Sequence, residues 1–298
     1  MSPTPFVSVI IPTYNHAPML HEALKALQAQ TFTNWEAIVI NNFSTDETIE
    51  VVNSFNDQRF TLINFSNKGI IAASRNEGIR NARANIIAFL DSDDFWYPTK
   101  LELSLAALTA DVDLVCHGEI WQKDGHVAAR MQYGPLGRAD YKHLLFEGNC
   151  LSTSAIIVRK QCLLEAGCFS EALEMITAED YELWLKLARN NVRFAFIDTM
   201  LGEYRIHEGN ASKAVIRNMN AELHVVEKHF SSLREICQVT ESQLNRRKSI
   251  TRINAARRLI SENAYADAFS CIAKAFADFP AIPFTIFSRI LRKTGIAE

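Results

Sequence analysis

The sequence predicts an α/β fold in which a mostly parallel sheet is flanked by helices. Over the first ninety residues, short runs rich in Val and Ile alternate with segments whose apolar residues recur at helical spacing. Strands that alternate with helices are joined by right-handed crossovers, which make neighbouring strands parallel. Polar residues also follow directly after three of the predicted strands. Because ligands of such sheets bind beyond the carboxyl ends of the strands, the pattern predicts a site there as well.

The first part of the chain contains four predicted strands and three predicted helices. Each strand is a β-branched or apolar run that ends at turn residues, and each helix has its apolar residues on one face. We expect strands at residues 6–12, 35–40, 60–65 and 86–90, and helices at residues 18–30, 46–55 and 70–84.

The remainder of the chain changes character near residue 215. Before this point the pattern is less regular, and beyond it the composition is helical. We therefore expect two domains, residues 1–215 and 216–298. The predicted elements are strands at 113–117, 154–159 and 192–197, a helix at 181–189, and helices at 221–230, 243–261, 264–276 and 284–292.

The composition is that of an ordinary globular protein. Hydrophobic residues make up 48% and charged residues 22% of the 298 positions. The six cysteines include no CxxC pair, which favours a reducing compartment over a disulfide scaffold or a zinc site. No signal peptide and no membrane-spanning run is predicted. We therefore expect a cytoplasmic protein.

Charge is distributed unevenly along the chain. Residues 1–213 hold 18 Lys and Arg against 26 Asp and Glu, whereas residues 214–298 hold 13 against 8. A basic tail suits contact with an anionic membrane or an acidic partner, and equally the solvated face of a helical bundle. Nucleic-acid binding is not expected, because the first part is acidic and the tail lacks interleaved aromatic residues.

Three carboxylates follow the predicted strand at residues 86–90, namely Asp91, Asp93 and Asp94. Carboxylates are the oxygen ligands that Mg²⁺ and Mn²⁺ prefer. Three acids so close together repel one another unless a cation or protons lie between them. The alternative is a solvated turn that caps the helix expected near Pro98. The residues of this segment by themselves leave both interpretations open.

Further polar motifs occur in a defined order along the chain. They are Pro12-Thr13-Tyr14-Asn15, Asn41-Asn42, Arg75-Asn76-Glu77-Gly78, Asp91-Ser92-Asp93-Asp94, Glu179-Asp180 and Tyr204-Arg205-Ile206-His207. Taken together, this set closely resembles the motifs of the inverting family 2 glycosyltransferases, which have the GT-A fold. The resemblance covers about residues 6–213 and leaves the helical tail outside it.

The resemblance implies a Rossmann-like GT-A fold and a metal-dependent transferase. Such an enzyme moves a single sugar, with inversion, from a nucleotide-sugar donor to a hydroxyl acceptor. The implied donor is a UDP-sugar, and the acceptor is a saccharide or a lipid-linked saccharide. The implied cation is Mn²⁺ or Mg²⁺, which acts as a Lewis acid on the leaving diphosphate. The expected setting is bacterial surface polysaccharide synthesis, with the basic C-terminal region at the inner face of the cytoplasmic membrane.

The resemblance also implies roles for individual acids. Asp180 is the expected base that takes the proton of the acceptor hydroxyl, with Glu179 beside it. Asp93, Asp91 and His207 are the expected metal ligands. Glu179 and Asp180 have an alternative interpretation, because acidic residues favour the first turn of any helix. The alternative for His207 is a purely structural histidine.

Donor binding is expected at the strand ends and on the third helix. In the family a second acid after the second strand contacts the uracil, whereas this chain carries Asn41 and Asn42 there. An amide still accepts a hydrogen bond and also donates one, and Asn42 is equally typical of a turn. The expected donor-binding residues are Pro12, Thr13, Tyr14, Asn42, Arg75, Asp91 and Ser92.

Two rival functions remain at this stage. The alternatives to the transferase are a catalytically inactive protein that binds nucleotide sugars on the same fold, and an unrelated Mg²⁺-dependent phosphate-transfer module. Donor hydrolysis that depends on Asp93 and Asp180 distinguishes the first rival from the transferase, and affinity for nucleoside diphosphates distinguishes the second.

Overall fold

The computed structural model describes residues 4–207, 209 and 214–280. The chain divides into two compact units. The sheet unit comprises Met1–Leu144 and Asn149–Asn210, and the helical unit comprises Leu145–Gly148 and Ala211–Glu298. The predicted helix at residues 284–292 lies outside the described residues.

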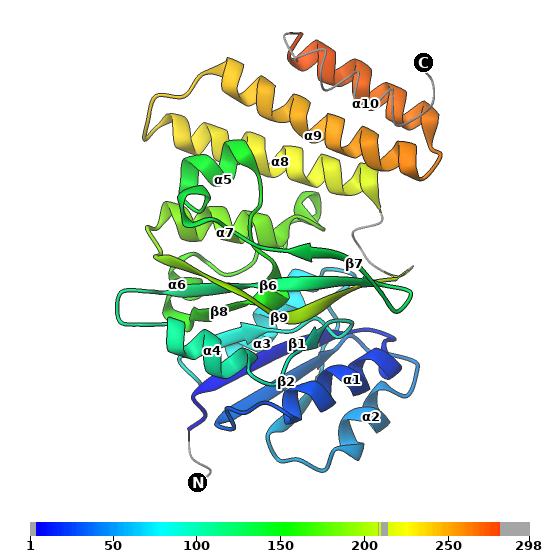
Figure 1. Ribbon diagram of the computed structural model, residues 1–298, viewed down its shortest axis with the longest axis vertical. Helices are drawn as coiled ribbons and strands as arrows, with labels where there is room; N and C mark the ends of the chain where they lie inside the picture. The colour runs from blue at the N-terminus through cyan, green and yellow to red at the C-terminus, as the bar shows by residue number, and fades with distance from the viewer. Residues whose placement is uncertain (1–3, 208, 210–213, 281–298) are drawn as a thin grey trace. The chain divides into compact units, whose positions relative to one another are not determined.

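The sheet unit is built on one sheet of nine strands (Figure 1). Its strand order is β3-β2-β1-β4-β8-β6-β9-β5, and β7 pairs with β6. The strands are β1 (Val7–Thr13), β2 (Trp35–Asn41), β3 (Phe60–Asn64), β4 (Ile86–Phe89), β5 (Phe95–Trp96), β6 (Leu114–Lys123), β7 (His126–Met131), β8 (Ile156–Arg159) and β9 (Phe194–Ile206).

The first four strands are parallel, as predicted from the alternation of strands and helices. Strand β8 runs antiparallel between β4 and β6, and β6 pairs in parallel with β9. The sheet is therefore mixed. The predicted α/β fold class, with helices flanking a mostly parallel sheet, is confirmed.

Among the described residues, seven α-helices lie wholly or partly in the sheet unit. Helix α5 crosses the boundary between the two units. The helices are α1 (Ala17–Gln28), α2 (Thr48–Ser54), α3 (Ile71–Asn81), α4 (Lys100–Ala107), α5 (Tyr141–Glu147), α6 (Lys160–Glu165) and α7 (Glu179–Arg189).

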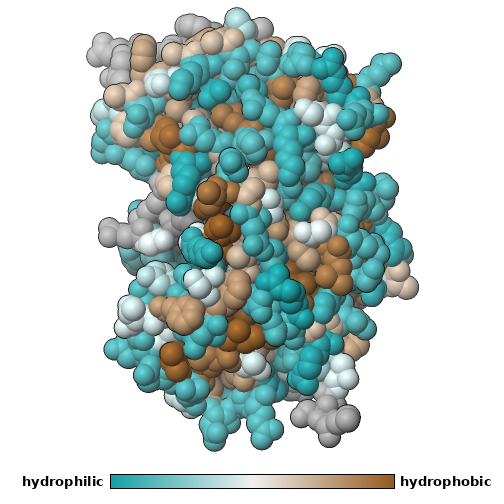
Figure 2. Space-filling view, turned by 180° about the vertical axis from the view of Figure 1, so that it is seen from behind, coloured by the Kyte–Doolittle hydropathy of each residue, from teal (hydrophilic) through white to brown (hydrophobic). Residues whose placement is uncertain are grey.

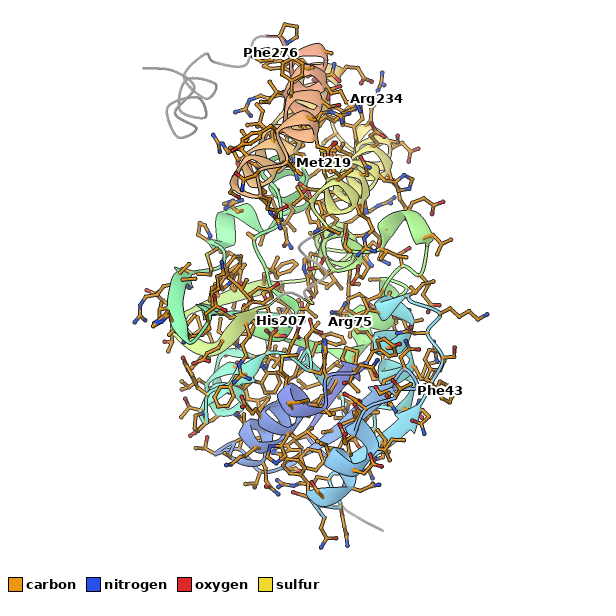
Figure 3. All side chains as sticks on the ribbon, turned by 90° about the vertical axis from the view of Figure 1, so that its right-hand side faces the viewer. Phe43, Arg75, His207, Met219, Arg234 and Phe276 are labelled. Carbon is orange, nitrogen blue, oxygen red and sulfur yellow. The ribbon has the colours of Figure 1, made fainter. Side chains whose placement is uncertain are left out.

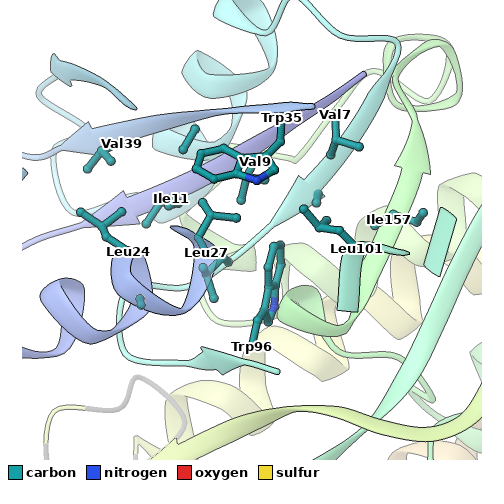
Figure 4. Close-up of a cluster of buried hydrophobic side chains, with 14 of the residues drawn as sticks. Val7, Val9, Ile11, Leu24, Leu27, Trp35, Val39, Trp96, Leu101 and Ile157 are labelled. Atoms are coloured by element: carbon teal, nitrogen blue, oxygen red, sulfur yellow. The ribbon is translucent and has the colours of Figure 1, made fainter. Parts of the chain in front are cut away.

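One face of the sheet packs against α1, and the buried side chains between them form the largest described hydrophobic core (Figure 4). Val9 and Ile11 alternate along β1, so both point to this face, where Leu24 and Leu27 of α1 cover them. All four side chains are fully buried. Burial of one such side chain contributes about 1.5–3 kcal/mol, so this contact holds α1 firmly beside the end of β1.

Helix α3 approaches the other face of β1 closely. A Cβ built at Gly78 would lie 2.4 Å from the Cγ2 of Ile10, which is closer than atoms can approach. Glycine at this position therefore allows α3 to lie directly against the strand. This close packing fixes the position of Arg75, which lies one turn earlier on the same helix.

The sheet unit differs from the prediction at several elements: β5, α5 and α6 were not predicted, and two larger differences concern the strands β7 and β9. The hairpin of β6 and β7 was not predicted, although Asp124-Gly125 forms its turn with φ angles of 50° and 77°. Strand β9 extends to Ile206, nine residues beyond the predicted end at residue 197. Both segments are largely exposed or half-buried, so they lack the apolar run by which buried strands are recognised.

The helical unit contains α8 (Val215–Arg234), α9 (Glu241–Ser261) and α10 (Tyr265–Asp278). Thr240 and Gln243 form a reciprocal capping box that begins α9. The helices enclose a small apolar core that includes Met219, Ala256 and Cys271. Within the described residues, no helix is both long and apolar enough to traverse a bilayer. Figure 2 shows one face of the molecule, on which hydrophobic residues occur in small groups among hydrophilic ones.

Candidate active site

The predicted donor-binding residues lie at the carboxyl edge of the parallel strands. Thr13 ends β1, Asn41 ends β2, and Asp91 follows β4 shortly after its end. Pro12 and Thr13 are buried in or at the end of β1, whereas Tyr14 is 52% exposed. The parallel pairing of β1 with both β2 and β4 brings these three ends together. This is the edge at which α/β sheets bind ligands.

The loop after β2 is held together by amide groups. The Asn42 N–H donates to the Thr13 carbonyl at 3.0 Å, and the Asn67 N–H donates to the Asn42 Oδ1 at 2.9 Å. Asn41 is fully buried and donates from its Nδ2 to the Asn64 Oδ1 at 2.8 Å. Because the Oδ1 of Asn42 already accepts from Asn67, the side chain offers a ligand chiefly its Nδ2 donor.

The loop after β4 is instead built from carboxylates. Asp94 is 2% exposed; its carboxylate accepts from the Ser154 hydroxyl at 2.6 Å and from the Arg205 N–H at 3.3 Å. The Ser154 hydroxyl in turn accepts from the Asp91 N–H at 3.1 Å. Burial, together with the nearby charge of Asp93, raises the pKa of Asp94 well above its usual value. Asp94 thus joins the Asp91–Asp94 loop to the end of β9.

Asp94 does not cap the following helix. Helix α4 begins at Lys100, and Thr99 occupies the position before its first turn. The interpretation of Asp94 as a helix cap is therefore wrong, because its carboxylate is occupied by partners in more distant parts of the chain.

Asp93 and His207 are brought together from the ends of β4 and β9. The Asp93 Oδ2 lies 2.9 Å from the His207 Nε2, and the two side chains are 17% and 25% exposed. The Gly209 N–H donates to the other ring nitrogen, Nδ1, at 3.1 Å. The Asp93 carboxylate is the kind of oxygen ligand that Mn²⁺ and Mg²⁺ prefer, and the His207 imidazole is a softer nitrogen ligand that suits a transition metal such as Mn²⁺ better than Mg²⁺.

The pair of Asp93 and His207 suits a cation that also binds phosphate groups. Within residues 4–207, 209 and 214–280, no group of three or more His, Cys, Asp or Glu side chains is arranged to hold a metal ion. Mg²⁺ is commonly held by one or two protein carboxylates and completed by substrate phosphates and water. The Asp93–His207 pair therefore fits a cation that takes its remaining ligands from elsewhere.

Arg75 joins the two groups of predicted acids. Its Nη2 donates to both carboxylate oxygens of Asp91 at 2.9 and 3.1 Å, and its Nη1 donates to the Glu179 Oε1 at 2.8 Å. The arginine is 4% exposed. A guanidinium is a rigid planar fork, so it holds the end of β4 and the start of α7 at a set spacing. The segments that carry Asp93 and Asp180 therefore converge on one place in the fold.

Glu179 and Asp180 form the first turn of α7, two residues earlier than the predicted helix start. The Thr177 N–H donates to the Glu179 Oε2 at 2.8 Å, and Thr177 itself has a φ of 82°. A β-branched residue in this region costs about 1–3 kcal/mol, and such strain is often found at functional sites. Glu179 is therefore held on one side by Thr177 and on the other by Arg75.

Asp180 has the protonation behaviour of an acid–base group. The pKa of its carboxyl is raised to about 7, first by burial and then by the neighbouring charge of Glu179, while Arg75 opposes the rise. The pKa of Asp180 also responds to the charge of Asp91, which shows that the two acids lie within electrostatic reach of each other. At neutral pH the group is poised to take up or release a proton.

Three buried polar residues near the site were not predicted from the sequence. Lys100 is fully buried, with its Nζ 3.1 Å from the Ile156 carbonyl and 3.7 Å from the centre of the Trp96 ring. His117 and Glu119 lie on β6 with exposures of 0% and 1%, and burial raises the pKa of Glu119 to about 7. The sequence signal that could have revealed His117 and Glu119 is that two polar residues occur within an otherwise apolar strand segment.

The predicted site residues therefore fall into three groups within the sheet unit, and Arg75 links the loop that carries the second group to the acids of the third. Figure 3 shows Arg75 and His207 in its central part and Phe43, from the loop after β2, further out. The first group is at the ends of β1 and β2, the second is the Asp93–His207 pair with Ser92, and the third is the set joined by Arg75. They comprise Pro12, Thr13, Tyr14 and Asn42; Ser92, Asp93 and His207; and Asp91, Arg75, Glu179 and Asp180.

The chain is similar to bacterial glycosyltransferases. It is 30% identical to an uncharacterised glycosyltransferase of Rickettsia felis, over 76% of this chain and 38% of that protein. It is 27% identical to the Escherichia coli UDP-Glc:alpha-D-GlcNAc-diphosphoundecaprenol beta-1,3-glucosyltransferase WfaP, over 72% of this chain and 84% of that protein. The match thus spans well under half of the first relative and most of the second.

Solved structures share the fold at low sequence identity. Residues 1–349 of S. aureus TarS in complex with UDP-GlcNAc align with a TM-score of 0.62 and 18% identity, over 97% of this chain and 92% of that one. The mannosyltransferase PcManGT of Pyrobaculum calidifontis, in complex with GDP-Man and Mn²⁺, aligns with a TM-score of 0.60 and 17% identity, over 99% and 81%. These two structural alignments show that this chain shares the fold of both proteins.

The family is established by the sequence itself. Residues 8–161, just over half of the chain, match the family described as Glycosyl transferase family 2. The matched range includes the ends of β1, β2 and β4, Arg75 and the Asp91–Asp94 loop. The chain therefore belongs to glycosyl transferase family 2.

Proposed function

We propose that this protein transfers one sugar from a UDP-sugar to a hydroxyl group of a lipid-linked saccharide, with inversion and with the help of Mn²⁺ or Mg²⁺. The observation that carries the proposal is Asp180, a carboxyl group with a pKa of about 7 beside the acids that Arg75 joins. A base with this pKa is half-ionised at neutral pH, where general-base catalysis is most effective.

Asp180 supplies the proton transfer in this proposal. Its carboxylate accepts the proton of the acceptor hydroxyl while that oxygen forms a bond to the anomeric carbon of the donor. The bond between the anomeric carbon and the diphosphate oxygen breaks at the same time, and the diphosphate leaves with the bonding electrons. Attack opposite the leaving group inverts the anomeric centre.

Arg75 and Glu179 hold the base in position. Glu179 receives hydrogen bonds from both Arg75 and the Thr177 N–H, so its carboxylate has little freedom to rotate. Its negative charge next to Asp180 keeps the pKa of the base high. Arg75 also holds the Asp91 carboxylate, which is the proposed contact to the donor.

Asp93 and His207 would hold the divalent cation. Bound there, the cation would neutralise the negative charge that develops on the diphosphate. Asp94 keeps the Asp93 loop attached to the strand that ends before His207, because its carboxylate bonds both Ser154 and the Arg205 N–H. Asp91, whose carboxylate is held by Arg75, is the proposed contact on the donor side of this pair.

The proposed donor site is completed at the ends of β1 and β2. Pro12 and Thr13 provide its buried floor, Tyr14 its exposed aromatic ring and Asn42 its amide donor, while Ser92 lies in the loop after β4. The match to WfaP, which is named for UDP-Glc and a diphosphoundecaprenol-linked acceptor, supports the classes of donor and acceptor. We place the reaction in surface polysaccharide synthesis, at the inner face of the cytoplasmic membrane.

The test is a transfer assay with a matched pair of variants. Purified protein, Mn²⁺ and a panel of UDP-sugars are incubated with a synthetic polyprenyl-diphosphate-linked GlcNAc, and the product is identified by mass spectrometry and its anomeric configuration by NMR. Asp180→Asn should remove the product, while Asp198→Asn, at an exposed position on β9, should not. UDP binding without transfer or donor hydrolysis would instead favour a catalytically inactive nucleotide-sugar-binding protein.

A further inference from the structure

His16 occupies an unusual position between two parts of the candidate site. It is the residue before the first turn of α1, where Ser, Thr, Asp and Asn are preferred because their side chains cap the helix. The imidazole of His16 makes no such cap. The Ala17 N–H is satisfied instead by the Asp46 carboxylate at 2.8 Å. The ring of His16 is thus left for other contacts.

Those contacts reach both sides of the Asp93–His207 pair. The His16 Nδ1 lies 3.1 Å from the Ser92 hydroxyl, which belongs to the residue directly before Asp93. The ring of His16 also packs edge to face on the ring of His207, with 5.7 Å between centroids and an interplanar angle of 85°. One side chain from the β1–α1 loop therefore contacts the end of β4 and the end of β9.

We propose that His16 is a positioning residue that fixes the orientation of the His207 imidazole relative to Asp93. The contact between the His16 Nδ1 and the Ser92 hydroxyl fixes the orientation of the His16 ring. The edge-to-face contact between the two rings then restricts the orientation of the His207 ring. Residues that orient a metal ligand typically change metal affinity 10- to 100-fold when they are substituted. The inference rests on the proposed function, because the Asp93–His207 pair is assigned there to the cation.

Two substitutions separate the two contacts of His16. His16→Asn places a polar atom near the position of Nδ1 but removes the ring, whereas His16→Phe keeps a ring and removes the bond to Ser92. The matched control is His21→Asn on the same helix, because His21 packs on Phe55, away from Ser92 and His207. Melting temperatures of all three variants establish that they are folded.

The first measurement uses the metal-free protein. Proton–nitrogen NMR correlations of the histidine rings report their environment and tautomer, and the His207→Gln spectrum assigns the signal of His207. We expect His16→Asn to shift the His207 signal and His21→Asn to leave it unchanged. An unshifted His207 signal in both His16 variants would overturn the inference, whatever the outcome of any activity assay.

The second measurement is the Mn²⁺ dissociation constant in the presence of UDP, followed by electron paramagnetic resonance. We expect an increase of about tenfold for His16→Asn, as for other residues that orient metal ligands, a smaller increase for His16→Phe, and none for His21→Asn. If the wild-type protein binds Mn²⁺ and His16→Asn binds it equally well, the inference fails while the proposed function stands. If the wild type binds no Mn²⁺ and the NMR signal still shifts, the cation role fails while the positioning of His207 stands.

Discussion

The loop after β2 and the loop after β4 lie at the same edge of the sheet but are built from opposite chemistry. The first is held by neutral amides, with Asn41 bonded to Asn64 and Asn42 bonded to Asn67. The second places Asp91, Asp93 and Asp94 within four residues. Burial raises the pKa of Asp94, and the charges of neighbouring carboxylates, Asp93 first among them, raise it further.

In the proposed function, this difference separates two tasks of a nucleotide-sugar site. A nucleobase is neutral and is recognised by directional donors and acceptors, which amides supply without a charge. A diphosphate and its cation require charged groups, whose interactions strengthen where water is excluded. Arg75 connects the charged loop to the proposed catalytic acids of α7, so substitutions there should have larger effects than substitutions in the amide loop.

The largest effect is expected for Asp180→Asn. Loss of a general base should lower the turnover number about 10²- to 10⁴-fold. The pKa of Asp180 is raised in the folded state, so the unfolded chain loses this proton near pH 4 and the folded chain near pH 7. Wild-type stability should therefore fall as the pH rises through this window, and the variant should melt at a higher temperature than the wild type at pH 8. A variant that melts lower would contradict the assignment of Asp180 as a half-buried acid whose ionised form is destabilised in the folded chain.

A smaller effect is expected for Asp93→Asn. Replacing the carboxylate by a neutral amide should weaken Mn²⁺ binding in the presence of UDP on the order of 100-fold, because a bond to a charged group contributes about 1.5–3 kcal/mol. Titration calorimetry measures the dissociation constant directly. Asp198→Asn removes an equal charge at an exposed position of β9 and serves as the control. Equal affinities in both variants would remove Asp93 from the cation site.

The pH dependence of transfer should follow Asp180. Below pH 7, kcat/KM should fall about tenfold per pH unit, because the protonated carboxyl cannot act as a base. Glu179→Gln should shift the acidic limb of the pH–rate profile to lower pH, since the charge of Glu179 raises the pKa of Asp180. Profiles of wild type and variant between pH 5 and pH 9 check both statements. A limb that stays in place in Glu179→Gln would show that another group titrates.

The smallest effect is expected in the amide loop. Asn42→Asp replaces the Nδ2 donor by a second acceptor while keeping the bond to the Asn67 N–H. Uracil presents an imide N–H that needs an acceptor, whereas the same position of cytosine is itself an acceptor. The variant should therefore gain several-fold in affinity for UDP relative to CDP, on the order of 1 kcal/mol.

The control for this comparison is Asn64→Asp. It adds the same charge in the same network and keeps an acceptor for the Asn41 Nδ2. An equal shift in the UDP-to-CDP ratio for both variants would mean that charge alone, and not the position of Asn42, sets the preference.

Most of the first half of the fold was predictable from the sequence because its signals are local. The strands β1, β2 and β4 are entirely buried, so they appear as short apolar runs, and α1 shows its buried face at helical spacing. The second half was harder to predict. Strand β9 is half-buried along most of its 13 residues, so only its first few residues carry an apolar signal.

The candidate site divides in the same way. The acids and the arginine were identifiable from their motifs, because such residues after strand ends are local features. Their partners were not. Arg75 was expected at the nucleotide from its motif, but the motif gave no sign that its guanidinium bonds Asp91 and Glu179, which are 16 and 104 residues away in the chain. His16 carried no signal at all, since a histidine before a helix is unremarkable until its distant contacts are known.

The sequence by itself determined the fold class, the family and the inventory of acids, because periodicity and short motifs act over a few residues. Only the tertiary structure decided which acids meet, which of them are buried, and that one guanidinium joins the end of β4 to the start of α7. The physical reason is that hydrogen bonds, desolvation and pKa shifts depend on distances between atoms that lie far apart along the chain. Asp180 illustrates this, because its pKa is set by burial and by Glu179, Arg75 and Asp91 together.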